Sequence, residues 1–152
     1  MVKLKIYLET TVPNYVFNDH LPEEQKVARR IFRLVKDGEI KGVISEVVVR
    51  ELNRTPEPRR SKLQKLVSDI KVLEVTPEAK KLAQEYVDAR VIPKSKLDDA
   101  LHIAIASIAE VDLPASWNLE HIVKAKTKIK VAEINSKKGY RTPVIVRPEE
   151  VI

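Results

Sequence analysis

Residues 3–8 read Lys-Leu-Lys-Ile-Tyr-Leu and decide the fold class of this 152-residue chain. Polar and apolar side chains alternate at first, and from Ile6 the run is continuously apolar, which is typical of a β-strand that enters the middle of a sheet. Outward from this stretch, residues 23–36 carry apolar side chains at helical spacing and are followed by Gly38 as a stop signal. The chain therefore opens with a strand followed by an amphipathic helix.

The same alternation of strand and helix continues along the chain. Short apolar runs predict further strands at 43–45, 70–75, 111–117 and 144–146. Capping residues and helical spacing predict helices at 46–53, 59–68, from 77 onward, at 95–110 and over most of 121–138. Such alternation favours parallel pairing through right-handed crossovers. We therefore expect residues 1–152 to form a single α/β domain, a three-layer α/β/α sandwich around a mostly parallel five-stranded sheet.

The composition narrows the function classes. Lys and Arg number 28 against 22 Asp and Glu, a net charge of +6 that would attract a polyanion, although a densely charged soluble surface of thermophilic type explains it equally well. The chain has no cysteine, which excludes disulfides and thiolate metal sites. No apolar run approaches the roughly 20 residues of a membrane span, and the N-terminus reads as a strand rather than a signal peptide. We expect a cytoplasmic protein without a membrane partner.

Acidic residues follow the predicted strands. Glu9 comes directly after the first strand, and Glu51 lies on the otherwise apolar helix after the second. In parallel sheets, ligands collect beyond the carboxyl ends of the strands, and a carboxylate on a helix that packs against the sheet needs a partner. Each acid taken alone is explained as well by a solvated or capping role. Their shared position makes them candidate site residues.

Asp98 and Asp99 open the most apolar helix of the chain and are assigned different roles. Ser95-Lys96-Leu97-Asp98 has the spacing of a capping box, which explains Asp98 as a residue that caps the helix. Asp99 points about 100° away from Asp98 on a helix, toward the direction of His102. We expect Asp99 to face a metal ion, whereas His102 on this buried helix is explained by a hydrogen bond in the core.

Asn118 follows the fourth predicted strand as Glu9 follows the first, and His121 lies three residues later. An amide oxygen is a ligand for a hard cation or a partner of its bound water, but it adds no negative charge. Carboxylate and carbonyl oxygens without thiolates suit Mg²⁺ or Mn²⁺, which activate water and neutralise phosphate charge. No zinc spacing, Ser-His-Asp pattern or glycine-rich nucleotide loop is present in the sequence.

These segments together resemble the PIN domain family. Residues 6–13, Ile-Tyr-Leu-Glu-Thr-Thr-Val-Pro, are similar to the opening of PIN domains, in which an acid is followed two positions later by Ser, Thr or Asn. Residues 45–52 and 97–104 are similar to the segments that bear the second and third acids. Residues 116–122 resemble the fourth segment of a subgroup with Trp-Asn where other members have an acid. The ordered set covers essentially the whole chain.

The resemblance implies a metal-dependent endoribonuclease of the VapC toxin type, which dimerises and is neutralised by a small antitoxin protein. Glu9, Glu51 and Asp99 would hold Mg²⁺ or Mn²⁺, with Asn118 completing the catalytic set. Thr11, Asn118 and His121 would orient the metal shell or the RNA. Glu9 departs from the commoner Asp, and Asn118 removes one charge from the site.

Three hypotheses remain open at this stage. The first is the ribonuclease, with Arg50 and Arg54 as candidate phosphate contacts, although ordinary helix-surface charges explain both arginines equally well. The second is a PIN-fold RNA-binding or protein-interaction module that is catalytically weak because Asn118 lowers the site charge. The third is a generic α/β hydrolase of small molecules, for which the sequence lacks a nucleophile elbow.

Overall fold

The computed structural model describes residues 3–152, and its strands form one parallel sheet in the order β3-β2-β1-β4. The strands are β1 (Lys5–Leu8), β2 (Lys41–Ser45), β3 (Lys71–Leu73) and β4 (Leu113–Ala115). The α-helices are α1 (Thr11–Tyr15), α2 (Pro22–Lys36), α3 (Glu46–Asn53), α4 (Arg59–Leu66), α5 (Pro77–Asp88), α6 (Leu97–Ile108) and α7 (Ala125–Lys138), with short 3₁₀ helices η1 (Lys94–Lys96) and η2 (Pro148–Val151).

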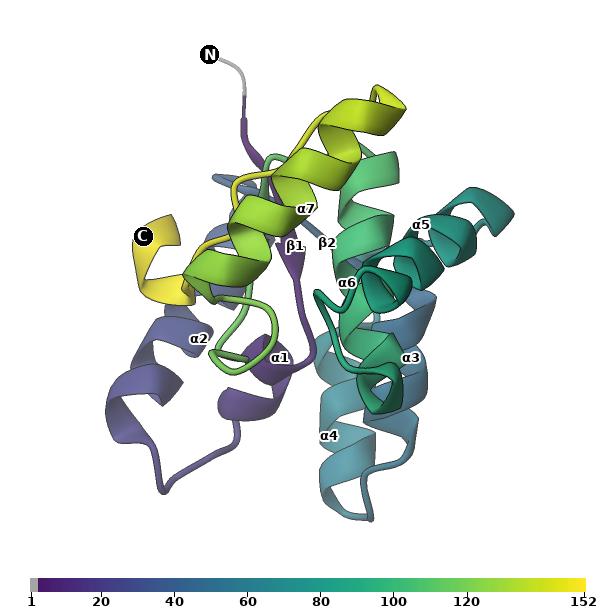
Figure 1. The fold of residues 1–152 in the computed structure, drawn as a ribbon. Coiled ribbons are helices and arrows are strands. Elements are labelled where there is room, and N and C mark those ends of the chain that lie inside the picture. Colours follow the sequence, from purple (N-terminus) through teal and green to yellow (C-terminus); the bar gives the residue numbers. More distant parts are fainter. Residues whose placement is uncertain (1–2) are drawn as a thin grey trace.

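The strand order explains how the helices are distributed. The chain runs from β1 through β2 to β3 in one direction and then returns past β1 to β4 at the opposite edge. Because parallel crossovers are right-handed, this reversal places α1–α4 on one face and α5 and α6 on the other. In Figure 1, α5, α6 and α7 lie on the viewer's side of the sheet and α2 lies farther back. The prediction of a parallel sheet flanked by helices is confirmed.

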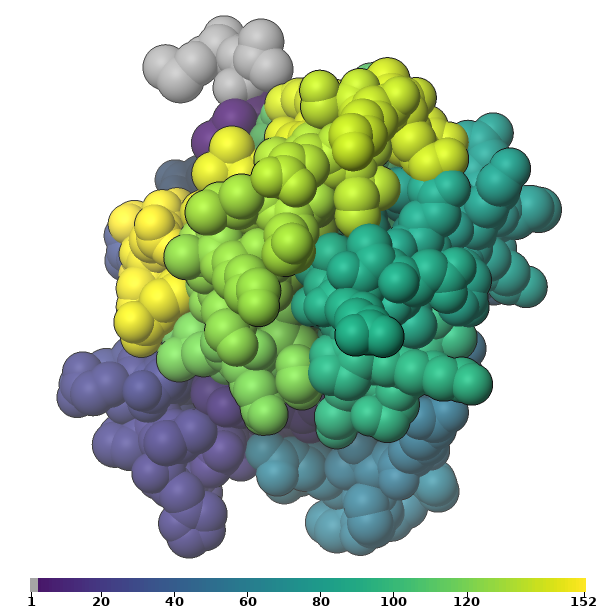
Figure 2. Space-filling view, viewed as in Figure 1, coloured from purple at the N-terminus to yellow at the C-terminus, as the bar shows by residue number. Residues whose placement is uncertain are grey.

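The hydrophobic core is centred on β1 and α6. Every residue of α6 from Ala100 to Ser107 is buried, as the continuous apolar pattern predicts. Tyr7 and Leu8 of β1 are fully buried beneath it. Each large apolar side chain removed from water in this way contributes about 2 kcal/mol before the entropy of ordering is subtracted. Figure 2 shows how the side chains of α7 and of the α5–α6 region cover this face. No helix within residues 3–152 is long and apolar enough to cross a membrane.

Local capping signals place two helix starts correctly. The Ser45 hydroxyl accepts hydrogen bonds from the backbone N–H groups of Val47 and Val48, which fixes α3 directly beyond β2. The Thr76 hydroxyl accepts from the N–H of Ala79 in the same way and starts α5. These caps matter for the site because they hold helices at the carboxyl ends of the strands.

The fifth strand predicted at 144–146 is wrong, because the sheet has four strands. This segment forms only one isolated parallel bridge, between Ala115 and Val146. The N–H groups of Val144 and Val146 donate to the carbonyls of Asp112 and Pro114. Beyond them, the N–H of Arg147 donates to the Glu150 carboxylate at 2.8 Å and η2 begins at Pro148. The segment therefore covers the edge of β4 without continuing as a strand. The helix predicted over most of residues 121–138 is confirmed as α7, which begins at Ala125.

Candidate active site

The candidate site lies where the strand order reverses, between the carboxyl ends of β1 and β4. Glu9 follows β1 and donates its backbone N–H to the carbonyl of Ala115 at the end of β4, at 3.2 Å. Ser116 follows β4, and α3 begins immediately after β2. Crevices at such a reversal are the usual ligand sites of open α/β sheets. The topology therefore gathers the side chains that follow three different strands.

Glu9 is 5% exposed, and its carboxylate is held by hydroxyl and amide donors. Oε1 accepts from Thr11 Oγ1 at 2.6 Å, from the Thr11 N–H at 3.1 Å and from Ser116 Oγ at 2.7 Å. Oε2 lies 4.0 Å from His102 Nε2. Three donors on one oxygen offset the loss of hydration that burial imposes on a carboxylate.

Glu51, in the last turn of α3, is the second acid of this cluster. Its Oε1 accepts from Thr10 Oγ1 at 2.7 Å and lies 2.6 Å from His102 Nε2. Partial burial alone would raise the pKa of Glu51, but the hydrogen bond and charge of His102 and the Thr10 hydroxyl outweigh it and lower the pKa. Glu51 is therefore ionised in the folded protein at neutral pH.

His102 connects the two acids to the core. Its Nδ1 lies 2.5 Å from the hydroxyl of Tyr7, which is 2.7 Å from the Ser45 hydroxyl that caps α3. Burial alone would lower the pKa of His102, but the hydrogen bond to Glu51 and the charges of Glu9, Glu51 and Asp99 raise it. Burial also raises the pKa of Tyr7 well above its usual value, so Tyr7 stays a neutral phenol. The hydrogen bond to Glu51 and the neighbouring acids thus favour the protonated form of His102.

Asp99, in the first turn of α6, is coupled electrostatically to the same group. Burial raises the pKa of Asp99, and a hydrogen bond from Asn118 with the charges of His102 and His121 opposes this only in part. The Asn118 Oδ1 accepts the backbone N–H of His121 at 3.1 Å, which leaves the NH₂ group of Asn118 to favour the charged form of Asp99. Asn118 therefore connects Asp99 to the loop that carries His121.

Thr11 joins the ends of β1 and β4. Its hydroxyl donates to Glu9 and accepts the backbone N–H of Trp117 at 2.9 Å. Ser116 has a parallel role, because its hydroxyl donates to Glu9 and accepts the backbone N–H of Asn118 at 2.9 Å. The Trp117 ring stacks on Tyr15, with ring centroids 4.8 Å apart, and its indole N–H donates to Glu149. These contacts fix the orientation of Glu9 and leave little freedom in the loop.

The capping box assigned to Asp98 is wrong. Residues 94–96 form η1, so α6 begins at Leu97 with Lys96 as its N-cap, and no side chain caps it. Asp98 instead pairs with Arg50 at 2.5 Å and with Arg54 at 3.8 Å. Both candidate phosphate contacts therefore have an acidic partner in this structure.

The donor set suits a hard divalent cation. Glu9 and Glu51 each use Oε1 for protein donors, and within the described chain neither Oε2 accepts a hydrogen bond. These two oxygens and the Asp99 carboxylate are the ligand type that Mg²⁺ and Mn²⁺ prefer. In residues 3–152, however, no three His, Asp or Glu side chains stand in the arrangement of ligands around a common ion. The three acids offer the oxygen ligands that such an ion prefers. In this structure, hydrogen bonds from neighbouring protein groups set the positions of the Glu9 and Glu51 carboxylates.

Sequence reasoning missed several members of the cluster. Ser116 lies directly after β4 and Thr10 two residues after β1, so the rule that selected Glu9 and Asn118 would also have found them. His102 had a weaker sequence signal: it lies about one helical turn beyond Asp99, on the same side of the helix. Tyr7 had none, because a tyrosine in a buried strand is ordinarily core.

Comparisons with known proteins agree with this fold. No protein family model matches the sequence, and no curated protein matches it. Among solved structures, the chain is similar to a chain of VapBC2 from Rickettsia felis bound to a DNA fragment from their promoter. The TM-score is 0.58 at 16% identity, over 93% of this chain and 97% of the other. The two chains share a fold.

Proposed function

We propose that this protein is a metal-dependent endoribonuclease of the PIN type and the toxin of a toxin–antitoxin pair. The observation that carries the proposal is that Glu9 and Glu51 meet at His102, with Asp99 coupled to the same histidine, at the reversal point of a parallel sheet. Clustered acids are unfavourable unless charge compensates them, and a dication would add such charge. RNA is the substrate that we assign to this site.

The residues divide into ligands and groups that orient them. Glu9, Glu51 and Asp99 would hold Mg²⁺ or Mn²⁺, which supplies an activated water and neutralises charge on a phosphodiester. Thr11 and Ser116 keep Glu9 in place through their hydroxyl groups. Asn118 and its backbone contact with His121 set the direction of Asp99. In this scheme Arg50 and Arg54 exchange their contact with Asp98 for phosphate when RNA binds.

The partner assignments rest on the fold and on the sequence resemblance. The similar solved chain comes from a VapBC2 complex on promoter DNA, and the four sequence segments resemble VapC toxins. Together they support a small antitoxin protein as a partner of this chain. We also assign a homodimer and a cytoplasmic location on the basis of the resemblance.

A second candidate function is an RNA-binding or protein-interaction module on the same fold. The observation that favours it is that His102 supplies a positive charge within the acidic cluster, while Asn118 lacks the charge of a fourth acid. The cluster is thereby partly neutralised without a metal. This module would bind partners but would not cleave RNA.

One set of experiments separates the two functions. Calorimetric titration of Mn²⁺ measures metal binding, and cleavage of a labelled single-stranded RNA with Mn²⁺ or with a chelator measures activity. For the ribonuclease, the wild type binds Mn²⁺ and cleaves, Glu51→Gln loses both, and the exposed control Glu110→Gln retains both. If the wild type neither binds Mn²⁺ nor cleaves RNA, the ribonuclease is rejected and the binding module takes its place.

A further inference from the structure

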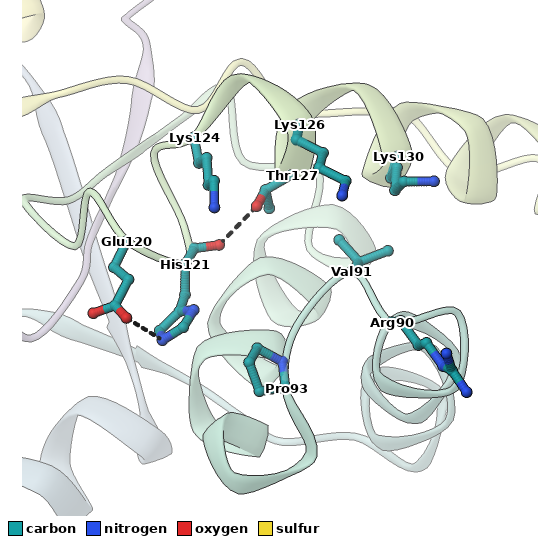
Figure 3. A pocket seen from close by; sticks show the side chains of 9 residues that line it. All are labelled: Arg90, Val91, Pro93, Glu120, His121, Lys124, Lys126, Thr127 and Lys130. Carbon is teal, nitrogen blue, oxygen red and sulfur yellow. Dashed lines mark hydrogen bonds and ion pairs between the residues drawn. The ribbon is translucent and has the colours of Figure 1, made fainter.

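A cleft of about 240 Å³ lies between the connection that leads from α5 to α6 and the start of α7. Figure 3 shows Lys124 and Lys126 on one side of it, with Val91 and Pro93 of the connection opposite. Arg90 and Lys130 also line the cleft. Sequence analysis assigned none of these residues to the site. The cleft therefore places four cationic side chains around one concave surface.

The cations of this cleft lack acidic partners. No acid anywhere in residues 3–152 forms an ion pair with Arg90, Lys124, Lys126 or Lys130. The acid that lines the cleft is Glu120, whose side chain is 83% exposed and lies 3.6 Å from His121. Six of the 28 Lys and Arg residues form ion pairs in the described chain: Arg50, Arg54, Arg60, Lys138, Arg141 and Arg147. The cleft concentrates positive charge that the protein does not neutralise.

The start of α7 adds to this positive field. A helix N-terminus carries the positive end of the macrodipole and favours acids in the first turn. The helices α2, α3, α5 and α6 each have an acid there, whereas α1, α4 and α7 have none. Lys124 is the N-cap of α7, and Lys126 lies in its first turn. Lysines at this end are unfavourable for the helix unless an anion binds beside them.

Arg90, on the opposite side of the cleft, has a strained backbone conformation. It has a φ of 61° after α5, and its N–H and that of Val91 donate to the carbonyls of Val87 and Tyr86. This is a Schellman motif, whose left-handed position is usually glycine because a Cβ atom is strained there. Elsewhere in the described chain, Gly38, Gly139 and the non-glycine residue Glu110 take positive φ values. Lysines at a helix start and a non-glycine residue at positive φ are both locally unfavourable, and such unfavourable choices are expected at functional sites.

The cleft adjoins the candidate active site through His121. This residue lines the cleft, its backbone N–H is held by Asn118, and its charge lowers the pKa of Asp99. A single RNA strand whose phosphodiester bond lies at Glu9, Glu51 and Asp99 would thus have a neighbouring phosphate in the cleft. We propose that this basic cleft binds the phosphate backbone of single-stranded RNA next to the cleaved nucleotide. This inference rests on the proposed ribonuclease function and says where the RNA lies beyond the candidate active site.

The test measures RNA binding in the full-length protein without divalent metal, so that no cleavage is required. A short fluorescein-labelled single-stranded RNA is titrated over a range of KCl, with fluorescence anisotropy as the readout. Each phosphate contact with a single strand contributes about 0.7 to the slope of log K against log salt. Lys126→Gln with Lys130→Gln should therefore reduce that slope by about 1.4. Lys36→Gln with Lys41→Gln, at the opposite end of the sheet, makes the same charge change and should leave the slope nearly unchanged.

A second pair of variants separates binding from folding. Glu110 has a φ of 53° in an equivalent Schellman motif after α6 and is exposed, so Glu110→Gly is matched to Arg90→Gly. Both substitutions relieve a strained backbone and should maintain or raise the melting temperature. Arg90→Gly alone should weaken RNA binding, by a similar factor for different RNA sequences.

The outcomes of the two proposals are distinct. If the cleft variants bind RNA with the same slope as the wild type, or if an oligoglutamate peptide displaces RNA from the cleft at equal charge concentration, the RNA path is overturned. If the slope falls as expected while the wild type fails to cleave RNA with Mn²⁺, the cleft stands as an RNA-binding surface and the ribonuclease fails.

Discussion

His102 Nε2 lies 2.6 Å from Glu51 Oε1, although the two residues are 51 positions apart in the sequence. The pair joins α6 to α3 at the carboxyl ends of the strands. Each group also favours the charged form of the other, because the pKa of His102 is raised and that of Glu51 is lowered. Stability and metal binding should therefore both depend on this contact.

The pair predicts a stability maximum between acidic and alkaline pH. Because the pKa of His102 is raised above 6.5, its contribution is complete below that value and is lost as the pH rises through the folded-state pKa. Because the pKa of Glu51 is lowered below 4.5, its contribution is complete above that value and is lost as the pH falls through the folded-state pKa. Urea unfolding of wild type and His102→Gln across this range tests both limbs. Equal pH profiles for the two proteins would contradict the assignment.

Asp98 and Asp99 should respond differently to substitution. Asp98→Ala removes a partly exposed pair with Arg50 and should cost at most about 1 kcal/mol, with activity largely kept. Asp99→Asn removes a proposed ligand and should abolish metal-dependent cleavage. It should cost little stability, since burial already disfavours the charge of Asp99 and raises its pKa. Urea unfolding and the Mn²⁺ cleavage assay measure the two effects, and a reversed pattern would show that the roles are exchanged.

Asn118→Asp should tighten Mn²⁺ binding and raise RNA cleavage, because it restores a negative charge beside Asp99. The metal-free protein should become less stable, since the Asn118 side chain now favours the charged form of Asp99 and a carboxylate would repel it. Thermal unfolding with and without Mn²⁺ should show a larger stabilisation by metal in the variant than in the wild type. A variant that is destabilised equally in both conditions would argue against metal at this position.

Ser116→Ala should destabilise the fold by about 2 kcal/mol, because it removes a hydrogen bond to the buried carboxylate of Glu9. It also frees the Asn118 N–H from the Ser116 hydroxyl. Ser61→Ala is a suitable control, since Ser61 is exposed and donates to Glu57 at the surface. Its cost should stay below about 0.5 kcal/mol. Equal losses in urea unfolding would mean that the hydroxyl of Ser116 does not support Glu9.

Features controlled by neighbouring residues were predictable from the sequence. Ser45 and Thr76 cap the helices that they precede, and the continuous apolar pattern of residues 97–108 predicts the buried helix α6. The short strand at 144–146 failed as a prediction because apolar character cannot show that this segment forms only one isolated bridge to β4 before η2 begins at Pro148. The capping box failed because η1 moved the helix start to Leu97.

By itself, the sequence determined the alternation of strands and helices and the placement of Glu9 directly after β1, since both depend on local periodicity. Asn118 was expected directly after a strand, but β4 ends at Ala115 and Ser116 takes that place. The tertiary structure decided which of these groups meet. His102 contacts Glu51, and Asp98 takes Arg50 as its partner, because α6 packs beside α3 across the ends of the strands. Such contacts depend on the packing of helices distant in sequence, and no local pattern of residues encodes that packing.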